Sequence, residues 1–168
     1  MRLLPEFQRR DIRGLAAAYQ PDLDEKALTA GQAIVAGRYT RANLMTIYDW
    51  KTNRRGRNRL LANTDEEIGD ALRVASTVTM DRSAVAVLRG LYGVNVPVAS
   101  AILTAMYPAR YTVLDFRALE ALGTNTSNRS LDFYLHYLAS CRSIADKWGV
   151  GLRDLDRALW QWSKQRRE

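Results

Sequence analysis

The sequence predicts an all-α fold. Apolar residues recur at spacings of three and four along most of the 168-residue chain, which is the period of an amphipathic helix. Gly, Pro and Asn separate these stretches, and no run of residues alternates as a strand ladder requires. Because no internal repeat or flexible linker is evident, we expect a single domain over residues 1–168 with about eight or nine helices.

The N-terminal half is predicted to contain four helices. The first lies within residues 1–19, with an apolar face made of Leu4, Phe7, Ile12, Leu15 and Tyr19. The other three begin at residues that can cap a helix, namely Asp22 or Asp24, Thr40, and the capping box of Thr64 and Glu67. Their predicted last residues are 36, 50 and 76.

Residues 84–106 are predicted to form two helices joined by a tight turn. Asp81 or Ser83 would cap the first helix. Gly93 takes a positive φ freely, and Asn95 is among the few other residues that tolerate one. Pro97 suits the first turn of the second helix, and Pro108 stops that helix.

The segment 111–122 is predicted to be extended as far as Leu114 and then helical from Phe116. Asp115 occupies the natural N-cap position between the two parts. It is the only acid between Asp81 and Glu120. A simple capping role is one interpretation, and it is compatible with a catalytic role because a cap fixes the carboxylate geometry.

The C-terminal third is predicted to contain a polar loop over residues 124–128 and two helices, at 131–148 and 152–164. His136 is the only histidine, and we interpret it as structural or solvent-facing.

The charge of the chain favours an anionic partner. Its formal net charge is +7, which indicates nucleic acid first and an anionic membrane surface second. Residues 51–59 hold five cations and no acid: Lys51, Arg54, Arg55, Arg57 and Arg59. Such a cationic segment can follow a DNA backbone, or it can be a solvated loop paired with Asp65, Glu66 and Glu67.

Other residue types exclude several classes of protein. A single cysteine, Cys141, cannot form an intrachain disulfide or supply the four thiolates of an iron–sulfur cluster. No secretory signal and no membrane-length apolar run is evident, so we expect a cytoplasmic protein that does not bind membranes as its main partner.

The turn near Gly93 has a possible binding role of its own. Gly90 and Ala99 are small enough for the two flanking helices to approach closely, which leaves backbone amides at the start of the second helix facing outward. Amides at the positive end of a helix dipole bind anions, including a DNA phosphate. An ordinary αα-corner that only packs the core is the alternative.

These residues resemble the helix-hairpin-helix DNA glycosylase superfamily. Residues 88–95, LRGLYGVN, are similar to its first helix and hairpin, residues 98–103, VASAIL, to its second helix, and residues 113–117, VLDFR, to its aspartate segment. The resemblance implies two helical lobes around a cleft, with the helix-hairpin-helix motif at about 84–106 and the aspartate segment at 111–122. Asn95 departs from the family's second glycine, and Pro97 stands where bifunctional members carry a lysine nucleophile.

The resemblance implies a monofunctional enzyme of base excision repair that hydrolyses the N-glycosidic bond of a damaged or modified base in double-stranded DNA. Asp115 would be its catalytic carboxylate. The DNA backbone would be bound by the hairpin and the cationic segment, at Gly93, Val94, Asn95, Val96, Val98, Lys51, Arg54, Arg55, Arg57 and Arg59. Candidate walls for the base pocket are Tyr48, Trp50 and Tyr92, with Lys51 as a polar reader or charge partner; Trp160 and Trp162 are ambiguous between pocket and core. The family also implies a monovalent cation at the hairpin; no other metal is predicted, and a monomer is favoured.

Two other functions remain open from the sequence. Pro97 and Asn95 are compatible with a non-catalytic helix-hairpin-helix protein that binds DNA without cutting the glycosidic bond. A helical adaptor that binds an acidic protein through the cationic segment is the third interpretation.

Overall fold

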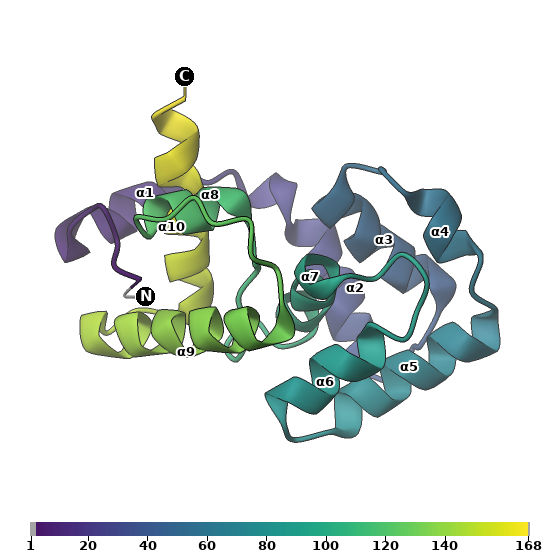
Figure 1. Ribbon diagram of the computed structural model, residues 1–168. Coiled ribbons are helices and arrows are strands. Elements are labelled where there is room, and N and C mark those ends of the chain that lie inside the picture. The colour runs from purple at the N-terminus through teal and green to yellow at the C-terminus, as the bar shows by residue number, and fades with distance from the viewer. Residues whose placement is uncertain (1–2, 168) are drawn as a thin grey trace.

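The computed structural model describes residues 3–167, and the predicted all-α class is confirmed across them. Ten α-helices and two short 3-10 helices follow one another along this range, and none of these elements is a strand (Figure 1). The α-helices are α1 (Ile12–Ala18), α2 (Glu25–Val35), α3 (Arg41–Thr52), α4 (Arg57–Leu61), α5 (Asp65–Thr77), α6 (Asp81–Leu88), α7 (Val96–Met106), α8 (Phe116–Ala121), α9 (Leu131–Trp148) and α10 (Leu152–Gln165). The 3-10 helices are η1 (Arg9–Asp11) and η2 (Pro21–Leu23). Residues 1 and 2 of the first predicted helix, and residue 168, lie outside the described range.

The two ends of the chain pack together. Helix α10 contacts α1, α8 and α9, while α2 and α3 contact each other and α7. Figure 1 shows α1, α8, α9 and α10 on one side of the molecule and α3 to α6 on the other. Contacts between α6 and α9 join these two groups of helices.

Helix α7 lies at the centre of the core. Every residue of α7 except Pro97 is buried. Helix α2 approaches α7 very closely, because a Cβ atom added to Gly31 would lie 2.0 Å from the carbonyl oxygen of Ala105. No side chain fits between two backbones at that separation, so the glycine fixes where α2 crosses α7.

The first predicted helix is shorter than its apolar pattern indicated. The helix begins only at Ile12, and the residues before η1 run without a regular element. In that segment Phe7 packs its ring against those of Trp148 and Trp162, with centroid separations of 5.9 and 6.3 Å. Leu4, predicted to face inward, is 48% exposed because the segment does not have helical periodicity.

The helix caps are predicted well where they are local. As predicted, Thr40 caps α3, Thr64 and Glu67 form the capping box of α5, and Asp115 caps α8. Ser130, which is not among the predicted caps, caps α9.

The carboxylates predicted to cap α2 and α6 do not make the capping hydrogen bonds. Asp24 precedes α2 but makes no capping bond, because its carboxylate pairs with Arg153 and Arg157. Met80 is the N-cap of α6, and Asp81 instead pairs with Arg110 and Arg142, at 2.7 and 2.6 Å. In both cases a distant arginine is the stronger partner for the carboxylate.

The cationic segment is not simply a loop. Helix α3 continues to Thr52, and residues 57–61 form the short helix α4. The turn between them has three residues with positive φ: Asn53 at 50°, Arg54 at 66° and Gly56 at 77°.

None of the helices within residues 3–167 has both the length and the apolar character of a membrane span.

Candidate functional site

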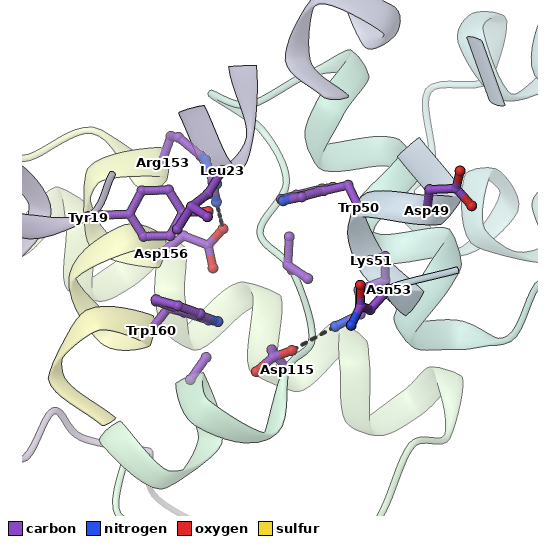
Figure 2. Close-up of a pocket in the computed structure, with 12 residues that line it drawn as sticks. Tyr19, Leu23, Asp49, Trp50, Lys51, Asn53, Asp115, Arg153, Asp156 and Trp160 are labelled. Carbon is purple, nitrogen blue, oxygen red and sulfur yellow. Dashed lines mark hydrogen bonds and ion pairs between the residues drawn. The ribbon is translucent and has the colours of Figure 1, made fainter. Parts of the chain in front are cut away.

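A cavity of about 500 Å³ opens beside the predicted catalytic residue. It lies between the end of α3, the start of α8 and one face of α10 (Figure 2). Its lining residues are Tyr19, Leu23, Asp49, Trp50, Lys51, Asn53, Val113, Asp115, Ala118, Arg153, Asp156 and Trp160. Of the predicted site residues, the cavity therefore brings together Trp50, Lys51 and Asp115.

Three helices hold the extended segment that carries Asp115. The hydroxyl groups of Tyr134 and Tyr137, on α9, donate to the carbonyl oxygens of Thr112 and Val113, at 3.2 and 2.9 Å. The N–H of Leu114 donates to Ser100 Oγ on α7, at 2.9 Å. Lys51 Nζ on α3 donates to the carbonyl oxygen of Leu114, at 3.1 Å. The segment is thus positioned by bonds to its backbone before Asp115 begins α8.

Both oxygens of the Asp115 carboxylate have partners. Oδ1 accepts a hydrogen bond from the N–H of Arg117, which caps α8, at 2.9 Å. Oδ2 forms an ion pair with Lys51 Nζ, also at 2.9 Å. The two side chains are partly buried, with exposed fractions of 23% for Asp115 and 12% for Lys51.

The net effect of this environment is to keep the Asp115 carboxyl ionised. Burial by itself raises the pKa of Asp115, but the ammonium group of Lys51 and the hydrogen bonds from Lys51 and Arg117 together outweigh burial. The pKa of Asp115 therefore lies below its usual value.

Aromatic rings flank the cavity on two sides. Figure 2 shows the ring of Trp50 on one side of the space above Asp115, and those of Trp160 and Tyr19 on the other. Trp50 belongs to α3 and Trp160 to α10, so elements far apart in sequence form the opposite walls. Flat apolar walls of this kind suit a flat aromatic ligand.

A buried network of charges lies at one end of the cavity. Arg153 pairs with both Asp24 and Asp156, and Arg157 also pairs with Asp24. The guanidinium carbon of Arg153 lies 5.6 Å from the ring centroids of Tyr19 and Trp50. Burial raises the pKa of Asp156, an effect that its pairing with Arg153 opposes.

Two predicted pocket residues lie elsewhere. Tyr48 is buried beneath the α3–α4 turn, where its hydroxyl donates to the carbonyl oxygen of Gly56 at 3.1 Å. Tyr92 lies on the turn between α6 and α7 with 68% of its surface exposed. Neither residue lines the cavity.

The cationic segment and the α6–α7 turn are adjacent. A Cβ atom added to Gly93, which has a φ of 81°, would lie 3.1 Å from Cβ of Arg59. Arg54 and Arg57 pair with Asp49, at 3.8 and 3.1 Å. Arg41, rather than the cationic segment, pairs with Asp65.

The turn itself is held by Asn63, which follows α4 and is buried. Asn63 Oδ1 accepts from the N–H of Tyr92 at 2.9 Å, and Asn63 Nδ2 donates to the carbonyl oxygen of Tyr92 at 3.1 Å. Nδ2 also donates to the carbonyl oxygen of Leu60, at 2.8 Å. One buried amide thus ties the turn to the helix that carries Arg57 and Arg59.

Asn95 has a different conformation from the one expected. Its φ is −92°, and its side chain caps α7 by accepting from the N–H of Val98 at 3.0 Å. The N–H of Val94 donates to the carbonyl oxygen of Leu91 at 3.2 Å. Among the described residues, the N–H groups of Gly93, Asn95 and Val96 have no hydrogen-bond acceptor.

Several lining residues were missed because they come from segments with other apparent roles. Tyr19 belonged to a predicted core face, and Asp49 and Asn53 flank the residues that were singled out. A usable signal existed in α10, where Arg153, Asp156 and Trp160 recur at helical spacing on one face. Spacing alone does not show that this face meets α3.

Comparison of the chain with protein-family models, curated proteins and solved structures found no match. Function is therefore inferred from the site itself.

Proposed function

We propose that this protein is a monofunctional DNA glycosylase that hydrolyses the N-glycosidic bond of a damaged or modified base. The observation that carries the proposal is an ionised carboxylate, Asp115, lining a cavity with indole rings on opposite sides. Breaking the N-glycosidic bond leaves positive charge on the sugar ring. A fixed carboxylate beside the sugar stabilises that charge and can orient the attacking water.

In this proposal the target nucleotide leaves the duplex and its base enters between Trp50 and Trp160. Stacking on aromatic rings offsets part of the stacking energy that the base loses in the duplex. Lys51 acts on Asp115 rather than on the base, because its ammonium group is already paired with that carboxylate. When the glycosidic bond breaks, the base leaves with the bonding electron pair and the sugar carbon becomes positive. Water then adds to that carbon, and the proton that the water loses balances the one that the departing base takes up.

The arrangement of helices supports the same proposal. The group of α1, α8, α9 and α10 and the group of α2 to α7 would be the two lobes of a glycosylase-like fold. Helices α6 and α7 with their turn would be the helix-hairpin-helix, and the three N–H groups without an acceptor would bind a phosphate of double-stranded DNA. The adjacent cationic segment would follow the backbone from there.

Pro97 supports a monofunctional reaction, because it has no amine to form a Schiff base. Residues 82–114 contain no acid, so this segment would offer a cation at the turn no carboxylate ligand, and backbone carbonyl oxygens would be its main ligands from this segment. The Tyr92 carbonyl oxygen accepts one hydrogen bond and keeps a lone pair for such an ion. No step of the proposed reaction needs the ion.

A non-catalytic DNA-binding protein is the second candidate. It is favoured by the fact that Oδ1 and Oδ2 of Asp115 both have partners within the protein. In that case the Lys51–Asp115 pair would only join α3 to α8.

Replacing Asp115 by Asn tests the proposal. We expect Asp115→Asn to abolish base release from duplexes that carry a panel of damaged and modified bases, because the amide cannot balance charge on the sugar. Duplex affinity, measured by fluorescence anisotropy, should remain within about threefold, since Asp115 contributes no positive charge to DNA binding.

Asp49→Asn is the matched control, because Asp49 lines the same cavity and pairs with Arg57 instead of Lys51. Base release by this control should persist. Undiminished release by Asp115→Asn would remove Asp115 from the mechanism, and absence of release by the wild-type protein on every substrate would favour the non-catalytic candidate.

A further inference from the structure

Beyond the cavity, cations and aromatic rings alternate along α8, α10 and the residues that follow α10. Lys164 Nζ lies 5.7 Å from the ring centroid of Trp160, and Arg117 Cζ lies 5.2 Å from the same centroid. Arg117 Cζ is also 5.2 Å from the ring of Phe116, and Arg167 Cζ is 5.3 Å from that ring. We call these five residues the cation–aromatic ladder.

The ladder begins at the proposed active site and leads away from it. Trp160 at one end is a wall of the cavity that contains Asp115. Phe116 follows Asp115 in sequence and is 49% exposed. At its far end the ladder meets another, smaller cavity of about 200 Å³, lined by Phe116, Arg129 and Arg167 among others.

Two arginines at the ladder, Arg117 and Arg129, are not neutralised by a carboxylate within the described residues. Glu120 accepts two hydrogen bonds from Arg167, each 3.1 Å long. Within residues 3–167, Arg117 and Arg129 form no ion pair with a carboxylate. Nη1 of Arg117 is buried and has no hydrogen-bond partner, so Arg129 and Arg167 are the guanidinium groups that a phosphate can reach directly. Arg129 donates only to the carbonyl oxygens of Thr126 and Asn128.

The ladder and the cationic segment flank the cavity from different elements. In Figure 2, Lys51 and Asn53, at the end of α3, lie on one side of Asp115, and Trp160, on α10, lies on the other. A strand that places one nucleotide at Asp115 must leave the cavity on both sides. The cationic segment begins at Lys51, on the α3 side of the cavity, and the ladder begins at Trp160, on the α10 side.

We propose that the cation–aromatic ladder, with Arg129, binds the sugar–phosphate backbone of the strand on the other side of the target nucleotide. This inference rests on the proposed function. A guanidinium fork matches the geometry of a phosphate group, and an exposed ring offers a face on which an unpaired base stacks without sequence preference. The partner is therefore DNA, with contacts that do not read its sequence.

The experiment compares two double variants of equal charge. The first, which we call the ladder variant, combines Arg129→Gln with Arg167→Gln and so removes two cations of the proposed surface. Arg73→Gln with Arg82→Gln is the control, because these arginines lie on α5 and α6, are more than half exposed, and line neither the main cavity nor the smaller one. Thermal unfolding followed by circular dichroism verifies that both variants are folded.

Affinity is measured by fluorescence anisotropy over a series of NaCl concentrations, with a short duplex that carries one tetrahydrofuran abasic analogue. Relative to the control, we expect the ladder variant to bind about tenfold more weakly at low salt. The slope of log K against log salt should be shallower by about 0.9 for each phosphate that the ladder variant no longer neutralises.

The outcomes separate this inference from the proposed function. Equal affinity and slope in the two variants would overturn the ladder inference while leaving Asp115-dependent base release intact. A weaker ladder variant in a protein that releases no base would support the ladder and refute the enzyme. A wild-type protein that binds no duplex at low salt would overturn both.

Discussion

At the scale of single residues, the pairing of Lys51 with Asp115 decides the state of the proposed catalytic group. Burial alone would raise the pKa of this carboxyl and favour its protonated form, which cannot stabilise a cation. The Lys51 ammonium group, 2.9 Å away, reverses that tendency. The lysine therefore keeps Asp115 ready to act well below neutral pH.

Replacing Lys51 should move the pH dependence of base release. In Lys51→Gln the burial of Asp115 is no longer offset by the ammonium group of Lys51, so the pKa of Asp115 rises and the acid limb of the pH–rate profile moves to higher pH. Lys51→Arg, which keeps the charge, should leave the limb near its wild-type position. The measurement is single-turnover base release across the acid range, and coincident acid limbs in all three proteins would contradict the expected role of Lys51.

The same pair has a consequence for stability. A carboxyl whose pKa is depressed on folding stabilises the protein fully above its unfolded pKa, which is about 3.9 for Asp. That stabilisation is lost as the pH falls through the folded pKa. The stability difference between wild type and Asp115→Asn should thus be constant near neutral pH and shrink only below about pH 4.

At the scale of elements, the α6–α7 turn depends on one buried side chain from a neighbouring helix. Asn63 bonds both the N–H and the carbonyl oxygen of Tyr92, and so fixes the turn relative to α4. The proposed phosphate-binding amides follow directly in the chain.

Asn63→Ala should therefore weaken both folding and DNA binding. It leaves partly buried backbone groups of Tyr92 without their partners, so the cost should not exceed the about 1–3 kcal/mol that each fully buried unsatisfied group costs. Asn58→Ala, at an exposed position on α4, is the control and should change stability by less than about 0.5 kcal/mol. Chemical denaturation measures the stability of the two variants. An Asn63 variant as stable as the control would show that the turn is held by other contacts.

Elements were predictable from sequence where their determinants are local. The Thr64–Glu67 box, Ser100 to Met106 as part of a helix, and Asp115 before α8 all follow from neighbouring residues. The caps assigned to Asp24 and Asp81 failed because each carboxylate instead pairs with arginines at least 29 positions away in sequence. Such long-range pairings leave no periodic signal.

At the scale of the whole molecule, a network of four charges ties the N-terminal part of the chain to α10. Asp24, at the start of α2, is fully buried and is held by Arg153 and Arg157. Asp156 completes the network beside the cavity.

Arg153→Met should strongly destabilise the fold, because it leaves two buried carboxylates without their main partner. Breaking a buried ion pair from one side costs about 3–5 kcal/mol. Arg157→Met should cost less, since Asp24 keeps its bonds to Arg153 and the Arg157 side chain is more exposed. Thermal denaturation compares the two, and equal losses would show that Arg153 has no special part in the network.

The cavity could be predicted only in part. Asp115, Trp50 and Lys51 are all indicated by the sequence, because each lies in or beside a recognisable motif. Tyr19, Arg153 and Asp156 are not predicted as pocket residues, and Trp160 is predicted only as ambiguous between pocket and core, since their positions depend on how α10 packs against α1 and α8. The pairing of distant helices, rather than the helices themselves, is what the pattern of one sequence does not contain.

The hydrogen bonds to residues 112–114 decide whether the protein or the DNA would have to distort when the proposed complex forms. Helices α3, α7 and α9 all hold this short stretch, and α3 and α10 supply the facing indoles. The space between the indole rings of Trp50 and Trp160 is thus preorganised before any ligand binds. On the proposed function, the work of bending and unstacking would fall on the nucleic acid, and lesions that soften the duplex would be engaged fastest whatever their chemical identity.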